Sequence, residues 1–381
     1  MSSSSGKKGT AFLEGELTKV DVAAIEKQLK ELWQSSTEGD QESTSVMRAC
    51  SSNFILLTDS DESAVDETLS EILSQHPSRA ILAIFNLDDE SQVHAWVSAR
   101  CHLASAKGQD KVCSEQITVH AKGGSTEQLA SVIRPLIVSD LPVFLWWRMP
   151  KVDNELLRPL ASMADALIVD SNADAFDHEF LESIQPMATS RSRLKALDLN
   201  WMRLNAWQRA LANAFDGYPL EVFDLANIES VAIHFASSKD GRVSNQALLL
   251  AAWMASRLRW TAAKKVSANK ISFQSNGSER SIELIAAKSF DAEQDSEGDI
   301  LEVAASLTEQ RSLAVKPEAA GEHGAMVARL YAGKSLESET TPAKLNISDA
   351  QLVVQQLEIT AFDVVFAESL NLAIEFGKVL K

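Results

Sequence analysis

The chain has 381 residues, 45% hydrophobic and 23% charged, which is ordinary for a globular protein large enough to hold two cores. Its formal charge of −17 argues against binding the phosphate backbone of nucleic acids, which needs a basic surface. No apolar run reaches the length of a membrane span and the three cysteines fit a reducing compartment, so we expect a cytoplasmic protein that binds neither membranes nor nucleic acid.

Residues 1–45 are predicted to form an N-terminal arm. Residues 1–8 are polar and basic with no apolar core behind them, which is typical of a disordered tail rather than a signal peptide. An amphipathic helix is predicted over 20–33, with one apolar stripe made of Val22, Ile25, Leu29, Leu32 and Trp33. The wholly polar stretch 34–45 is typical of a linker.

Residues 46–217 are predicted to form an α/β domain. A strand ending at 54–57, a helix over 61–75 and a strand over 80–87 predict a parallel pair joined by a right-handed crossover. Strands and helices then alternate, with helices predicted at 125–138, 154–163 and 174–184 and strands at 139–148 and 166–170. This order predicts a mixed, mainly parallel sheet flanked by helices.

Two long strands, 92–103 and 111–121, are predicted to form an antiparallel hairpin within this sheet. A register symmetric about Lys107 gathers the apolar residues on one face, whereas a slip by one residue would scatter them. The same register places His94 opposite His120 and Cys101 opposite Cys113. We therefore expect Cys101 and Cys113 to lie within bridging range as a candidate redox pair; the alternative is two small buried hydrophobic side chains.

The stretch Ser139–Arg148 is predicted to be a buried strand with two adjacent tryptophans. Alternation along the strand directs Trp146 to one face and Trp147 to the other. One interpretation is a strand in the centre of the sheet with bulky residues on both faces. The other is that a tryptophan at an edge of the sheet anchors a partner protein.

A helix from Trp201 to Phe215, capped at 198–200, is predicted to close the α/β domain before the breaker Gly217–Pro219. Arg203 and Trp207 lie off its apolar seam, which makes them better interface candidates than Trp201.

Residues 218–381 are predicted to form an α+β domain with a mostly antiparallel sheet. Strands are predicted at 231–235, 270–275, 281–287, 300–307 and 311–315, and helices at 244–260 and 363–380. The dipeptide Asn276-Gly277 between two of the strands is a strong signal for a tight hairpin.

Five segments of the chain together resemble the OpcA family, the glucose-6-phosphate dehydrogenase assembly proteins. These signature segments are 76–79 (HPSR), 113–117 (CSEQI), 139–148 (SDLPVFLWWR), 198–204 (DLNWMRL) and 253–260 (WMASRLRW). The resemblance extends from about Val46 to Trp260 and fades towards the C-terminus. It implies a bacterial protein that activates the dehydrogenase of the pentose phosphate pathway and is not itself an enzyme.

Residue patterns for catalysis, metal binding and nucleotide binding are weak. The seven histidines are scattered, and no nucleophile elbow or phosphate loop is present. The Gly123-Gly124 turn and the acidic residues Asp59, Asp61 and Asp170, at the carboxyl edge of the sheet, are the remaining candidates. Plain turns and helix caps explain these residues equally well, so we expect no catalytic, cofactor or metal site.

Two functions follow from these observations. The first is a regulatory protein that binds glucose-6-phosphate dehydrogenase, with Trp146, Trp147, Arg148, Arg203 and Trp207 as predicted contacts. The alternative is an α/β enzyme or sensor that binds a sugar phosphate at the carboxyl edge of the sheet and the Gly123-Gly124 turn.

Overall fold

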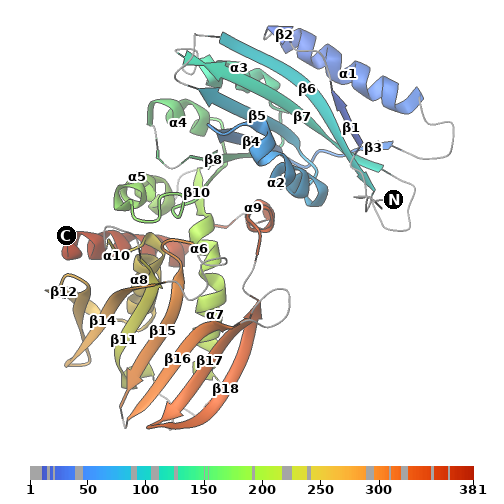
Figure 1. Cartoon of the computed structure of the whole chain (residues 1–381). Coiled ribbons are helices and arrows are strands. Elements are labelled where there is room, and N and C mark those ends of the chain that lie inside the picture. The colour runs from blue at the N-terminus through green and yellow to red at the C-terminus, as the bar shows by residue number, and fades with distance from the viewer. Residues whose placement is uncertain are drawn as a thin grey trace. The chain divides into compact units, whose positions relative to one another are not determined.

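The chain, in a computed structural model, forms two compact units whose segments interleave along the sequence (Figure 1). The first unit comprises Met1–Val169, Ser192–Leu197 and Asp349–Thr360, and the second comprises Asp170–Arg191, Asp198–Ser348 and Ala361–Lys381. The structure describes residues 11–14, 18–19, 22–38, 46–86, 92–103, 111–123, 128–149, 151–152, 154–190, 194–216, 225–237, 242–288, 296–308, 310–318, 325–344, 347–358 and 361–381. The predicted domain boundaries at residues 45 and 217 stay a prediction.

The first unit is built on a mixed sheet with strand order β1-β6-β7-β5-β4-β8-β9-β10; β2 also pairs with β6, and β3 with β7. The strands are β1 (Ala11–Glu14), β2 (Thr18–Lys19), β3 (Val46–Arg48), β4 (Asn53–Thr58), β5 (Arg79–Asn86), β6 (Gln92–Leu103), β7 (Lys111–Lys122), β8 (Val143–Arg148), β9 (Ala166–Val169) and β10 (Lys195–Asp198). Strands β3, β7, β5, β4, β8 and β9 pair in parallel, whereas β6 is antiparallel to its neighbours. The predicted mixed, mainly parallel sheet is confirmed.

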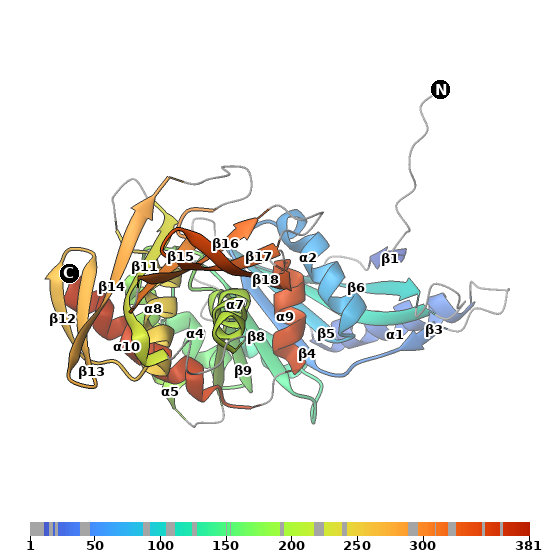
Figure 2. The same cartoon turned by 90° about the horizontal axis from the view of Figure 1, so that it is seen from below.

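Helices cover both faces of this sheet. They are α1 (Val22–Glu38), α2 (Glu62–Gln75), α3 (Leu129–Ile133) with the short 3-10 turn η2 (Arg134–Leu136), α4 (Asn154–Ala161) and α9 (Asp349–Glu358), which packs beside α2 (Figure 2). All six residues of β4 are buried, because a central parallel strand is covered on both faces. The four predicted inward residues of α2, Val65, Leu69, Ile72 and Leu73, are all buried.

The predicted hairpin register is confirmed over the whole length of β6 and β7. Ala95 pairs with Val119, His94 with His120, and Cys101 with Cys113. Cys113 is completely buried and disulfide-bonded, Cys50 forms no disulfide, and Cys101 is the third cysteine of the chain.

Two predictions for this part of the chain need correction, and one stays untested. Helix α1 continues to Glu38, so the beginning of the predicted linker is helical, since no glycine or proline interrupts it before Gly39. The helix predicted over 125–138 is α3 followed by η2, because Pro135 lacks the N–H that an α-helical turn requires. The predicted N-terminal tail lies outside the described residues.

The second unit is built on a sheet with strand order β12-β13-β14-β11-β15-β16-β17-β18. The strands are β11 (Ile228–Ala236), β12 (Thr261–Ser267), β13 (Lys270–Ser275), β14 (Ser278–Ala287), β15 (Ile300–Leu307), β16 (Arg311–Glu318), β17 (Ala325–Ala332) and β18 (Ser335–Lys344). Only β11 and β14 pair in parallel within the described part of this sheet, so the predicted, mostly antiparallel sheet is confirmed. The Asn276-Gly277 turn has positive φ at both residues, as a two-residue hairpin requires.

The helices of the second unit are α5 (His178–Thr189), α6 (Leu199–Arg203), α7 (Asn205–Asp216), the 3-10 turn η3 (Leu225–Asn227), α8 (Asn245–Arg257) and α10 (Val364–Leu380). Helix α5 starts four residues later than predicted, because Asp177 is the residue that caps it. The helix predicted from Trp201 is divided at Leu204 into α6 and α7. Strands β12, β17 and β18 and helix α9 were not predicted. No helix in the described ranges has both the length and the apolar character needed to cross a membrane.

The paired position of Cys101 and Cys113 leads to a first prediction. Thiol counting on denatured protein is expected to give one free thiol after oxidation, from Cys50, and three after reduction. The Cys50→Ser variant, as the matched control, should give none and two. Three free thiols in the oxidised wild-type chain would contradict the pairing.

Candidate functional site

A buried ion pair joins two signature segments in the first unit. Arg79, from the 76–79 segment, and Glu115, from the 113–117 segment, lie opposite each other on β5 and β7. Arg79 Nε donates to Glu115 Oε2 over 2.8 Å, and the two residues are only 5% and 2% exposed. Charges buried this deeply require a partner, because removal from water is costly.

The same guanidinium holds two further elements on its face of the sheet. Arg79 Nη1 donates to Glu26 Oε1 on α1 and to the carbonyl of Leu136 in η2, both over 3.0 Å. Ile25 and Leu29 of α1 are buried beside this contact. The role of Glu26 was missed, since an acidic residue on the polar side of an amphipathic helix resembles a solvated charge.

The tryptophan pair of the 139–148 segment fills the core of the first unit. Trp146 is 2% exposed and Trp147 is fully buried, on a strand that lies between β4 and β9. Trp147 Nε1 donates to the carbonyl of Lys151 over 2.9 Å. The burial therefore favours the interpretation of a strand in the centre of the sheet. Arg148, at the end of the same strand, is partly exposed, and its side chain forms no hydrogen bond or ion pair within the described part of the chain.

In the second unit a buried polar network surrounds Asp198, the N-cap of α6. Asp198 Oδ1 accepts hydrogen bonds from the backbone N–H groups of Ser171 at 2.9 Å and Asn200 at 3.1 Å. Oδ2 accepts the Ser171 hydroxyl at 2.7 Å. The predicted cap is confirmed. Burial, together with the neighbouring Asp170 carboxylate, raises the pKa of Asp198 to about 6.

The network continues through two buried amide side chains. Asn200 Nδ2 donates to Ser171 Oγ over 3.0 Å, and Gln246 Nε2 donates to Asn200 Oδ1 over 3.0 Å. Gln246 Oε1 accepts the backbone N–H of Ile300 at 2.9 Å, which links α6, α8 and β15. Sequence reasoning missed Ser171 and Gln246. The only signal in the sequence was the polar run that ends at Gln246, ahead of the apolar residues of helix α8. Such a run indicates where a helix starts.

Two more residues of the 198–204 segment reach other parts of the second unit. Arg203 donates to both carboxylate oxygens of Asp170 over 2.8 Å. Trp201 Nε1 donates over 3.0 Å to Asp363 Oδ2, from the residue that caps α10. Asp170 and Asp363 lie at or near points where the chain enters the second unit, as do Ser171 and Asp198.

The five predicted contact residues therefore differ in accessibility. Trp146, Trp147 and Trp207 are at most 4% exposed, and Arg203 is held by Asp170 with about a quarter of its side chain exposed (24%). Trp207 was placed off the buried seam, but α7 packs against β17 and β18 and buries it. The participation of all five in partner binding stays a prediction, and Arg148 and Arg203 are the two that are partly exposed.

The remaining chemical candidates do not converge on one site. Asp59 and Asp61 are exposed, and His120 stacks on Trp96 with ring centroids 4.7 Å apart. In the described ranges no three His, Cys, Asp or Glu side chains are grouped so that they could hold a metal ion. Residues 124–127, which include most of the predicted anion-binding turn, lie outside the described residues.

Two family models match most of the chain. One, described as the glucose-6-phosphate dehydrogenase subunit N-terminal domain, matches residues 69–186, and the corresponding C-terminal domain matches residues 195–370. The second match corrects the expectation that the resemblance fades after Trp260.

Curated relatives agree with these models over part of their length. The OxPP cycle protein OpcA of Nostoc punctiforme is 34% identical over 199 residues, which cover 50% of this chain and 40% of that protein. The OpcA protein of Synechocystis is 31% identical over 191 residues, covering 50% and 39%. The aligned region therefore spans about two fifths of these relatives.

Solved structures show only a loose likeness. The oxidoreductase yvaA from Bacillus subtilis superposes with a TM-score of 0.45 and 8% identity, covering 86% of this chain and 96% of that one. The WlbA dehydrogenase from Bordetella pertussis gives a TM-score of 0.41 and 13% identity, covering 87% and 96%. Likeness of this degree establishes neither a shared fold nor a shared activity.

The Arg79–Glu115 pair leads to a prediction about stability. Replacing Arg79 with Met leaves two carboxylates without their cation, and we expect it to lower the free energy of unfolding by about 3–5 kcal/mol. Lys27→Met is the control, because Lys27 forms an exposed pair with Glu31 at 3.6 Å, worth at most about 1 kcal/mol. The free energy of unfolding is measured by urea unfolding. Equal losses for the two variants would show that the buried pair stabilises the chain no more than an exposed pair does.

The pKa of Asp198 leads to a prediction about pH. A folded pKa of about 6, above the ordinary 3.8, means that this group favours folding below pH 4 and loses that contribution as the pH rises through 6. Relative to Asp198→Asn, the wild type should lose on the order of 3 kcal/mol of unfolding free energy between pH 4 and 7. Asp59→Asn, an exposed control, should follow the wild-type curve. A difference in unfolding free energy between the wild type and Asp198→Asn that stays constant with pH would refute the raised pKa of Asp198.

Proposed function

The chain belongs to the OpcA family of glucose-6-phosphate dehydrogenase assembly proteins, and from this we propose that it binds glucose-6-phosphate dehydrogenase and promotes the assembly or allosteric activation of that enzyme. The observation that carries the proposal is the pair of family matches, which together extend from residue 69 to residue 370 with one short gap. The names of the cyanobacterial relatives, OxPP cycle proteins, agree with a place in the oxidative pentose phosphate pathway. We also propose that the protein acts in the cytoplasm, without a cofactor.

The use of polar groups in the signature segments supports a non-catalytic role. Arg79 and Glu115 pair with each other in a buried ion pair, and Arg203 and Asp170 form a second, partly exposed pair. Asp198 accepts three hydrogen bonds from within its own unit. A catalytic group must present an atom to a substrate, whereas these side chains present theirs to the protein itself. We infer that the segments stabilise a scaffold whose outer surface meets the enzyme.

An activator of this kind acts by preferring one state of its target. It must bind the active dehydrogenase more tightly than the inactive form, and a ten-fold gain in apparent substrate affinity needs about 1.4 kcal/mol of such preference. A rigid surface supplies this preference at little entropic cost, since few side chains are ordered on binding. We infer that the buried Arg79–Glu115 pair and the hydrogen-bond network around Asp198 supply that rigidity.

Mixing the purified chain with the dehydrogenase of the same organism tests the proposal. We expect the two to co-migrate in size-exclusion chromatography and the rate at low glucose 6-phosphate to rise, with no turnover by the chain alone. Absence of both the complex and the rate change, at concentrations up to about 100 μM, would refute the proposed function.

Arg148→Ala tests the contact assignment in the same assay. Because Arg148 is partly exposed and unpaired within the described residues, the variant should keep its melting temperature while binding the dehydrogenase about ten-fold more weakly. Arg158→Ala, an exposed arginine on α4, is the matched control. Trp147→Ala should instead lose stability, by about 3–5 kcal/mol. Normal binding by a folded Arg148→Ala chain would remove this residue from the interface.

A further inference from the structure

A basic surface lies at one edge of the second unit, where α8 ends and β12 begins. Residues 242–278 contain six Lys or Arg residues and no Asp or Glu, although about one residue in seven of the whole chain is acidic. This stretch includes the signature segment 253–260. Four cations of the stretch are exposed, and none of them belongs to the networks described above: Arg257, Arg259, Lys264 and Lys265.

Arg259 occupies a position that ordinarily requires glycine. It follows α8 with a φ of 56°, and the next N–H, of Trp260, donates to the carbonyl of Ala255 over 2.9 Å, as in a Schellman cap. Glycine adopts this left-handed conformation without strain, whereas arginine does not. Backbone strain at an exposed arginine indicates a function for its side chain.

Two of the exposed cations have partners within the unit. Arg257 pairs with Glu368 on α10. Lys265 Nζ donates over 2.9 Å to the carbonyl of Leu380, and the charges of Lys381 adjoin that carbonyl in the chain. Neither Arg257 nor Lys265 is therefore free to bind a further group.

Arg259 and Lys264 carry the remaining charge of this surface. The side chains of both form no hydrogen bond or ion pair among the described residues. Glu279 and Glu283 lie on β14, two strands and about 10 Å from β12, and Glu283 is paired across the strands with Lys270. Exposed charges at that distance are largely screened at physiological salt.

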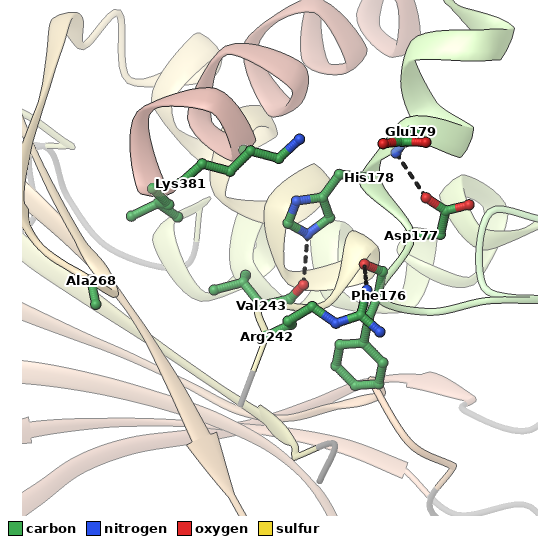
Figure 3. A pocket seen from close by; sticks show the side chains of 10 residues that line it. Phe176, Asp177, His178, Glu179, Arg242, Val243, Ala268 and Lys381 are labelled. Carbon is green, nitrogen blue, oxygen red and sulfur yellow. Dashed lines mark hydrogen bonds between the residues drawn. The ribbon is translucent and has the colours of Figure 1, made fainter. Parts of the chain in front are cut away.

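The acidic groups of a neighbouring pocket lie away from this edge. Ala268, in the turn between β12 and β13, lines a pocket of about 340 Å³ together with Asp177 and Glu179. Figure 3 shows both acidic residues on the opposite side of this pocket from Ala268. Asp177 accepts the backbone N–H of Glu179 at 3.0 Å as the cap of α5. The pocket therefore separates these carboxylates from the turn that ends β12.

Strand β12 itself has a free edge. It is the outermost strand of its sheet, so no strand pairs with its outer N–H and C=O groups in the part of the chain that the structure describes. The strand is exposed at nearly every position, and Val266 is 56% exposed. Lysines on such an edge oppose pairing with a neutral or basic strand. An acidic strand is instead attracted to them.

We propose that Arg259, Lys264 and the outer edge of β12 bind an extended, acidic segment of the partner protein, which adds to the sheet as a further strand. The backbone of this segment pairs with β12, and its Asp or Glu side chains meet the two free cations. In a chain with a formal charge of −17, this edge also directs an acidic partner to one place on the surface. The identity of the partner as glucose-6-phosphate dehydrogenase rests on the proposed function, whereas the acidic chemistry of the segment does not.

A short labelled peptide of alternating Glu and Val tests the edge on the full chain, without the dehydrogenase, by fluorescence anisotropy. We expect saturable binding at low salt that weakens about ten-fold or more at about 200 mM salt. The double variant Arg259→Glu/Lys264→Glu should lose about as much affinity. A peptide with Gln in place of each Glu should also bind about ten-fold more weakly. The amides of β12 should exchange more slowly in the complex, because the added strand accepts hydrogen bonds from them.

Two further variants separate binding from folding and from net charge. Arg158→Glu/Lys334→Glu makes the same change of charge at exposed positions on α4 and in the β17–β18 turn, and should bind within about two-fold of the wild type. Arg259→Gly removes a cation and relieves the backbone strain, so it should keep or raise the melting temperature while it weakens binding. Absence of saturable binding by the wild type, equal weakening in the charge control, or unprotected β12 amides would overturn the proposal.

The dehydrogenase of the same organism separates this inference from the proposed function. If it binds the wild type and the charge control but binds Arg259→Glu/Lys264→Glu about ten-fold more weakly, the edge is its contact. Equal binding of all three chains would leave the proposed function standing and refute this edge as the site of the enzyme. Binding to none of them would refute the proposed function, and the peptide measurements then decide whether the edge binds acidic segments.

Discussion

The hydrogen bonds that Asp198 accepts from Ser171 and Asn200 are the constraint on which the second unit depends most. Three donors converge on one carboxylate that is 1% exposed. A buried carboxylate with fewer partners would be too costly to keep. Around it, Arg203 holds Asp170 and Trp201 holds Asp363, so one short helix gathers residues that are distant in sequence. The contacts of the 198–204 segment within the second unit give its polar residues a structural role.

The Arg79–Glu115 pair has the same role in the first unit. It fixes the start of β5 against β7 and, through Glu26 and Leu136, brings α1 and η2 to one face of the sheet. In both units several polar residues of the signature segments, such as Arg79, Glu115 and Asp198, are thus directed inward, whereas Arg148, Arg257 and Arg259 are partly or fully exposed. A surface that recognises a partner is built from exposed residues such as these, and we propose that the inward networks keep that surface in one shape. Such preorganisation lowers the entropic cost of association.

Much of the fold could be predicted from local patterns. The β6–β7 register follows from apolar alternation over two long strands, and the β13–β14 hairpin from its Asn276-Gly277 turn. The missed elements lack such signals. Strand β12 is exposed at nearly every position, and helix α9 packs on α2, which is far away in sequence. The burial of Trp146 and Trp147 could not be decided, because it depends on which strands lie beside β8. The residues of the polar networks are likewise brought together only by tertiary contacts.

Hydrogen exchange of the Ser171 and Asn200 amides in the native chain tests the central role of Asp198 most directly. Both N–H groups donate to its carboxylate. If this contact holds the unit together, the two amides should exchange only through global unfolding, with the same denaturant dependence as the amides of the central strand β11. Faster exchange that is insensitive to denaturant would show that the contact opens locally, and would contradict the assignment of this network as the centre of the second unit.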